Sequence, residues 1–94
     1  MRVEYTRQWL ADLRKIGADS FRFEVALAIE LRIRMVIAQI AQHPKAAALV
    51  VDRPGMRVAP LIRYPYKIFY RVLEDRVKIL HIRHTARKPW TTKS

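Results

Sequence analysis

The apolar residues of this 94-residue chain change their spacing once, near the middle of the sequence. Residues 21–42 run without glycine or proline and carry apolar side chains at helical spacing, until His43-Pro44 stops them. A connector over residues 44–55 ends in a Pro-Gly turn signal. Beyond it, apolar and polar residues alternate in three segments, at 56–62, 66–73 and 77–83. The first half is therefore predicted to be mainly helical and the second half to form strands.

The N-terminal residues predict one more strand and a first helix. Residues 1–5 alternate between apolar and charged side chains, which is typical of an opening strand. Thr6 is expected to cap a helix that ends near Gly17. The 94 residues are thus predicted to form a single α+β domain in the order β-α-α-β-β-β, with a helical hairpin packed on a small antiparallel sheet.

The second predicted helix carries more apolar surface than one buried face needs. One apolar stripe consists of Val25, Ile29, Ile33, Val36, Ile37 and Ile40. A second stripe, displaced by about half a turn, consists of Phe23, Leu27, Leu31, Met35 and Ala38. Two interpretations stay open: either both stripes merge into one wide core-facing surface, or the surplus apolar surface is covered by a bound partner.

The balance of charge and the lack of cysteine limit the class of function. The chain has 19 Lys and Arg against 8 Asp and Glu, a net charge of +11, and residues 51–94 carry +8 of it. Such a field favours an anionic partner. With no cysteine, a disulfide scaffold, a thiol nucleophile and a Cys-ligated zinc site are excluded. No apolar run approaches the ~18 residues of a membrane span, so we expect a soluble, cytoplasmic protein without a membrane partner.

Two groups of residues in the second half are candidates for chemistry. Lys67 and Arg71 lie ~13 Å apart along one strand with Phe69 between them, as in a patch that binds single-stranded nucleic acid; the alternative is an ordinary solvated face. Near the end of the last strand, His84 is a candidate general base among cations, or a structural residue. His81 and His84 are expected on opposite strand faces, so no metal site is predicted, and no phosphate-binding glycine motif indicates a cofactor.

Residues 56–72, with Tyr64-Pro65-Tyr66 and the following alternating strand, and residues 77–87, ending in His84-Thr85-Ala86-Arg87, resemble the RelE/ParE superfamily of bacterial type II toxins. The similarity covers nearly the whole chain. It implies a toxin that is neutralised by a cognate antitoxin, whose acidic or amphipathic segment wraps around it. Such a segment would cover the second stripe, so the antitoxin-binding candidates are Phe23, Leu27, Leu31 and Met35.

The superfamily has two branches with different targets. The ParE-like branch, which the Tyr-Pro-Tyr and His-Thr-Ala-Arg segments favour, poisons DNA gyrase without being a nuclease. Its implied target-binding candidates here are Arg83, His84, Arg87, Lys88 and Trp90. The RelE-like alternative is ribosome-dependent mRNA cleavage, for which the candidates are Lys67, Arg71, Arg83, His84 and Arg87. The C-terminal tyrosine of that branch has no counterpart in this sequence. A basic nucleic-acid-binding module without toxicity is a third alternative.

Overall fold

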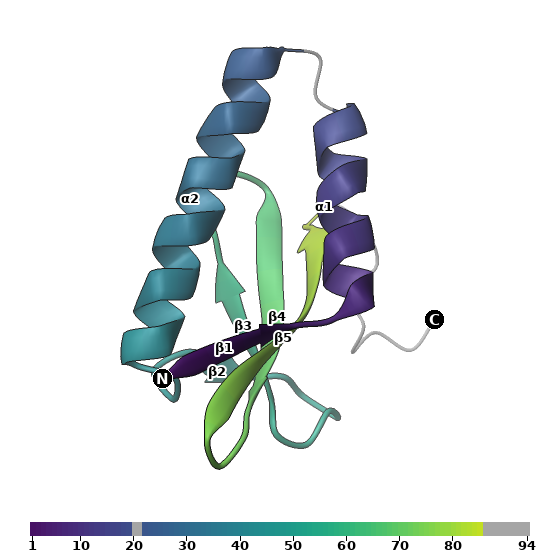
Figure 1. Cartoon of the computed structure of the whole chain (residues 1–94). Helices are drawn as coiled ribbons and strands as arrows, with labels where there is room; N and C mark the ends of the chain where they lie inside the picture. The colour runs from purple at the N-terminus through teal and green to yellow at the C-terminus, as the bar shows by residue number, and fades with distance from the viewer. Residues whose placement is uncertain (20–21, 86–94) are drawn as a thin grey trace.

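The computed structural model describes residues 1–19 and 22–85, and Figure 1 shows two helices lying over one face of a sheet. The elements, in chain order, are β1 (Arg2–Tyr5), α1 (Arg7–Asp19), α2 (Phe23–Gln42), β2 (Ala48–Leu49), β3 (Met56–Pro60), β4 (Tyr66–Val72) and β5 (Arg76–His84). The α+β class and the predicted order are confirmed, with one addition. The addition is β2, a two-residue strand inside the connector that the sequence predicted to be irregular.

The sheet is mixed, which corrects the expectation of a purely antiparallel sheet. Its order is β1-β5-β4-β3-β2, and β1 pairs in parallel with β5, whereas all other neighbours are antiparallel. Alternation along a strand reveals its faces but not its neighbour, so β1 had no predicted partner. Because the helical hairpin carries the chain away from β1 before the meander begins, the last strand returns beside the first in the same direction.

The start of α1 is fixed by Thr6, as predicted. The Thr6 hydroxyl accepts a hydrogen bond from the Trp9 amide at 3.1 Å and donates one to the Leu80 carbonyl at 2.7 Å. Further along α1, a carboxylate oxygen of Asp12 accepts a hydrogen bond from the Ile82 amide at 3.1 Å. Helix α1 therefore covers the edge of β5 beyond the end of β1, and its side chains form hydrogen bonds with backbone groups of β5 there. It also continues two residues beyond Gly17, where its end was predicted.

The core lies between α2 and the helix-facing side of the sheet. It includes the predicted first stripe of α2, at Ile29, Ile33, Val36, Ile37 and Ile40, but Val25 is exposed, contrary to prediction. Tyr70 is fully buried at the centre of the sheet and donates a hydrogen bond to the Pro44 carbonyl at 2.7 Å, beyond the end of α2. The C-terminal end of α2 is thus anchored to the sheet, whereas Phe23 and Val25 at its hairpin end are exposed.

Candidate functional site

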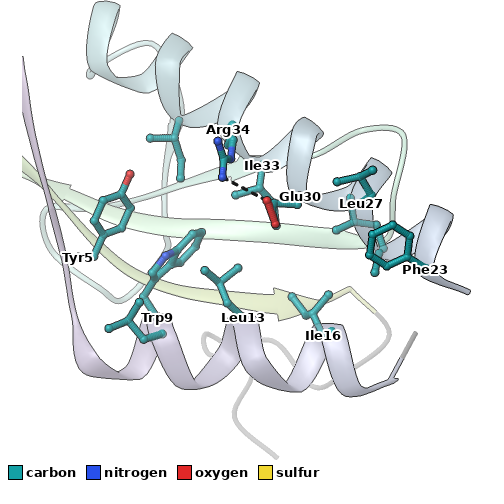
Figure 2. Close-up of a pocket in the computed structure, with 14 residues that line it drawn as sticks. Tyr5, Trp9, Leu13, Ile16, Phe23, Leu27, Glu30, Ile33 and Arg34 are labelled. Carbon is teal, nitrogen blue, oxygen red and sulfur yellow. Dashed lines mark hydrogen bonds and ion pairs between the residues drawn. The ribbon is translucent and has the colours of Figure 1, made fainter. Parts of the chain in front are cut away.

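An open apolar groove of about 620 Å³ lies between the two helices. Figure 2 shows Trp9, Leu13 and Ile16 of α1 facing Leu27 and Phe23 of α2 across it. Trp9 is buried at its base, and Tyr5 stands at one end with its ring 5.9 Å from that of Trp9. A groove of this size and lining has the shape that an amphipathic helix or a similar apolar segment needs.

Polar groups in the groove are few and sit at its rim. Arg34 and Glu30 of α2 form an ion pair at 3.2 Å, drawn as a dashed line in Figure 2. Both side chains are more than half exposed, so the pair adds little to stability. It does place one donor and one acceptor beside the apolar lining, where a partner can use them for orientation.

The second apolar stripe of α2 is a separate ridge rather than part of the core. Its four large side chains are exposed, at 78% for Phe23, 44% for Leu27, 59% for Leu31 and 51% for Met35. The interpretation in which both stripes merge into one buried surface is therefore wrong. The groove is lined by Phe23 and Leu27, whereas Leu31 and Met35 lie outside it on the outer surface of α2.

The sheet face turned away from the helices is basic. In the register of β4 and β5, Lys67 lies opposite Arg83 and Arg71 lies opposite Lys78, so like charges face each other twice. The Arg71 guanidinium donates to the Pro54 carbonyl, and Phe69, between the two pairs, is only 7% exposed. Lys67, Phe69 and Arg71 thus share one face as predicted, but the ring offers little surface for stacking a base.

His84 lies on the other side of the sheet from Lys67 and Arg71. It pairs with Tyr66, one position away from the Lys67–Arg83 pair, so its side chain points to the helix-facing side. There its ring meets that of Tyr66 edge-on at 5.1 Å, beside a smaller polar pocket of about 300 Å³ that is also lined by Asp12, Lys15 and Arg83. The strand register brings the nuclease candidates Lys67, Arg71 and Arg83 onto one face and places His84 on the other, although Arg83 and His84 both line this pocket. Of the remaining candidates, Arg87, Lys88 and Trp90 lie outside the described residues.

His81 is the histidine associated with the basic face, opposite Phe69. Its Nδ1 lies 3.6 Å from a carboxylate oxygen of Asp12. Burial lowers the pKa of His81, and this outweighs the opposite effect of the Asp12 carboxylate; Arg83 lowers the pKa further. At neutral pH, His81 is therefore a neutral side chain that connects α1 to β5.

Two kinds of feature, a cluster of metal ligands and a membrane-spanning helix, are absent from residues 1–19 and 22–85. Within these ranges, no three His, Asp or Glu side chains gather closely enough to hold a metal ion. None of the helices in the same ranges has both the length and the apolar character needed to cross a membrane.

The sequence did not identify the α1 wall of the groove as part of a site. Leu10, Leu13 and Gly17 belong to α1 and line the groove, and Leu10 is about half exposed. Their helical spacing is the same as that of core residues, so the pattern gives no sign that α1 and α2 stand apart. Ile62 was predicted to end a strand over residues 56–62, but β3 stops at Pro60 and Ile62 lies 79% exposed in the β3–β4 loop.

Comparisons with known proteins agree on one family and one fold. Residues 3–89 match the family model described as ParE toxin of type II toxin-antitoxin system, parDE. A structure of the chromosomal ParDE TA system from P. aeruginosa is similar, with 27% identity, a TM-score of 0.76, and coverage of 89% of this chain and 95% of the other. The isolated E. coli RelE toxin has the same fold, with 15% identity, a TM-score of 0.66, and coverage of 93% and 86%.

The intact E. coli RelBE toxin-antitoxin complex also contains a chain with this fold, at 14% identity and a TM-score of 0.68, with coverage of 93% of this chain and 98% of the other. A comparison with curated protein sequences gives no match.

Proposed function

Because the chain belongs to the ParE toxin family of type II toxin–antitoxin systems, we propose that it arrests bacterial growth by inhibiting DNA gyrase and that a cognate antitoxin neutralises it. The observation that carries this proposal is the match of residues 3–89 to the ParE model, which spans all described elements except the first residue of β1. The similarity to the P. aeruginosa ParDE system supports it. Such action takes place in the cytoplasm, where gyrase works on DNA.

The arrangement of the basic face favours gyrase inhibition over mRNA cleavage. A nuclease of the type implied by the RelE resemblance would need His84 near the cations that hold phosphates, within reach of the same reacting group. His84 instead faces the helix side, against Tyr66. His81 lies on the cationic side, but it is close to Asp12 and opposite the buried Phe69. His84 shares its pocket with Arg83 and Lys15, but Lys67 and Arg71 do not line that pocket. The division of the candidates between two sides of the sheet favours a binding surface over a nuclease centre.

We assign contact with the target to the end of β5. Arg83 and His84 lie where the described chain leaves the sheet, and the candidates Arg87, Lys88 and Trp90 follow them in sequence. A cationic strand end of this kind suits an anionic surface on the target.

We assign antitoxin binding to the groove. An amphipathic segment would bury the exposed Phe23 and Leu27 against the α1 wall, and acidic residues on its outer side would match the +11 charge of the chain. Phe23 alone is 78% exposed, so its burial by a partner supplies about 2 kcal/mol or more of binding free energy.

The test is expression of the chain alone in a bacterial host, followed by a DNA supercoiling assay with purified gyrase. We expect growth arrest, intact mRNA and inhibited supercoiling. Arg83→Gln should weaken inhibition, while Arg14→Gln, which removes one charge from an exposed position on α1, serves as the matched control. Unimpaired growth contradicts the toxin proposal. Rapid mRNA cleavage on ribosomes with active gyrase would replace it by the RelE-like endonuclease.

A further inference from the structure

Ile62 combines an unfavourable backbone conformation with an exposed apolar side chain. Its φ is +69°, in the left-handed region that β-branched residues rarely enter, and its side chain is 79% exposed. The Arg63 amide donates to the Leu61 carbonyl at 2.8 Å, which closes a tight three-residue turn around it. Leu61 itself is fully buried. The loop therefore holds an apolar side chain out into solvent at a conformational cost, and such strain is concentrated at functional sites.

Arg32 of α2 joins this turn to the exposed ridge. Its Nε donates to the Leu61 carbonyl at 2.9 Å, and its Nη1 lies 3.2 Å from the Met35 sulfur. A single guanidinium thus contacts both the backbone next to Ile62 and the last large side chain of the ridge. Figure 1 shows the β3–β4 connection passing beside α2, as this contact requires.

The ridge and the turn form one continuous exposed track. Phe23, Leu27, Leu31 and Met35 follow one another at four-residue spacing, so each lies next to the one before it along α2. The first two line the groove, the last two lie outside it, and Met35 leads through Arg32 to Ile62. A segment that fills only the groove leaves the second half of this track exposed.

The track also ends close to the proposed target contact. Across the sheet, Pro60 pairs with Lys67 and Lys67 pairs with Arg83, so the β3–β4 loop lies at the end of the sheet where β5 stops. The Thr85 amide donates to the Pro65 carbonyl at 2.7 Å, which ties the end of β5 directly to this loop.

Charge decides which kind of partner fits the track. Arg63 follows Ile62 in the sequence, Arg32 contacts the carbonyl of Leu61 just before it, and the chain carries a net charge of +11. A second copy of this chain would bring cations against cations there, which disfavours self-association. A segment with apolar and acidic side chains complements both the apolar track and the cations beside it.

We propose that the antitoxin segment, after filling the groove, crosses α2 over Leu31 and Met35 and ends on Ile62, with its acidic side chains at Arg32 and Arg63. This assignment rests on the proposed function and extends it, because it gives the path of the antitoxin and its final anchor. A segment on this path reaches the sheet end that carries Arg83 and obstructs the approach of the target there.

The test compares three variants with the wild-type chain for binding to its cognate antitoxin, purified at full length. Ile62→Asn removes the anchor and tolerates the positive φ. Val51→Asn makes the same change at an apolar loop residue of similar exposure, 71%, away from the track. Leu27→Asn changes the groove itself. Each melting temperature is measured, because relief of the strain at Ile62 should raise it by about 2–8 °C for Ile62→Asn.

We expect Ile62→Asn to weaken antitoxin binding about tenfold while the variant alone still arrests growth. Val51→Asn should bind as the wild type does. If Ile62→Asn binds unchanged while Leu27→Asn binds weakly, the proposed path is wrong and the groove assignment stands. If Ile62→Asn keeps full antitoxin binding but loses toxicity, Ile62 contacts the target instead and the proposal is overturned. A wild-type chain that neither arrests growth nor binds the antitoxin contradicts the proposed function and this assignment with it.

Discussion

Thr6 is the residue whose hydroxyl positions the α1 wall of the groove, and Thr6→Val tests this. Valine keeps the shape of threonine and removes only the hydroxyl, which accepts from the Trp9 amide and donates to the Leu80 carbonyl. Loss of the N-cap costs about 1 kcal/mol, and loss of a partner for a part-buried carbonyl costs about another. We therefore expect a loss of about 2 kcal/mol in the free energy of unfolding, and a melting temperature lower by roughly 8–16 °C.

The matched control is Thr6→Ser, which keeps the hydroxyl and loses a methyl group. The free energy of unfolding of Thr6→Ser should fall by less than about 1 kcal/mol. The assay is urea denaturation followed by far-UV circular dichroism, with the slope of the transition required to be equal among the three proteins. Equal midpoints for Thr6→Val and Thr6→Ser would refute the role of the hydroxyl. A lower midpoint for Thr6→Val alone supports it and should be accompanied by weaker antitoxin binding, since α1 forms one wall of the groove.

Three further outcomes follow from single residues. Gly17→Ala should raise the free energy of unfolding by about 0.5–1 kcal/mol in thermal or urea denaturation, since Gly17 lies inside α1 and a Cβ there meets nothing within 4 Å. Tyr70→Phe should lower it by about 1 kcal/mol in the same assay, because the hydrogen bond to Pro44 is lost at a buried position. Burial lowers the pKa of His81 below its usual 6.5, so its contribution to stability is complete above pH 6.5 and is lost as the pH falls through the pKa in the folded state. The difference in melting temperature between pH 7.5 and pH 5.5 should therefore be smaller for His81→Gln than for the wild type.

Local patterns in the sequence were enough to predict the helices, the strands and the second apolar stripe of α2, but not whether that stripe is exposed. The stripe was recognisable because Phe23, Leu27, Leu31 and Met35 repeat at helical spacing beside the core stripe, and the structure decides between the two interpretations by exposing all four side chains. The resemblance to the superfamily was predictable from the order of the strand segments, and the match over residues 3–89 confirms it.

What the sequence could not reveal depends on contacts between distant segments. In β5, Val77 and Ile79 keep a two-residue period, but the next core residue is Ile82, because the register with β4 shifts between Phe69 and Tyr70. The bulge depends on the pairing of both strands, so alternation in one of them does not predict it. The positive φ of Ile62 likewise occurs in a loop that contacts a distant segment, since the Leu61 carbonyl accepts a hydrogen bond from Arg32, 29 residues away. The groove exists because of the gap between two helices, which neither helix determines alone.

The positive charge and the apolar groove lie on different sides of the sheet, so they should affect different steps of antitoxin binding. The facing pairs Lys67–Arg83 and Arg71–Lys78 lie on the face turned away from the helices, where they attract an acidic partner over about a Debye length. Affinity, in contrast, comes from burying Phe23 and Leu27 in the groove. Raising the salt concentration from 0.05 to 0.5 M should therefore slow association about tenfold or more and change dissociation by less than about twofold, as measured by stopped-flow fluorescence. A salt effect mainly on dissociation would mean that ion pairs, rather than the groove, hold the complex together.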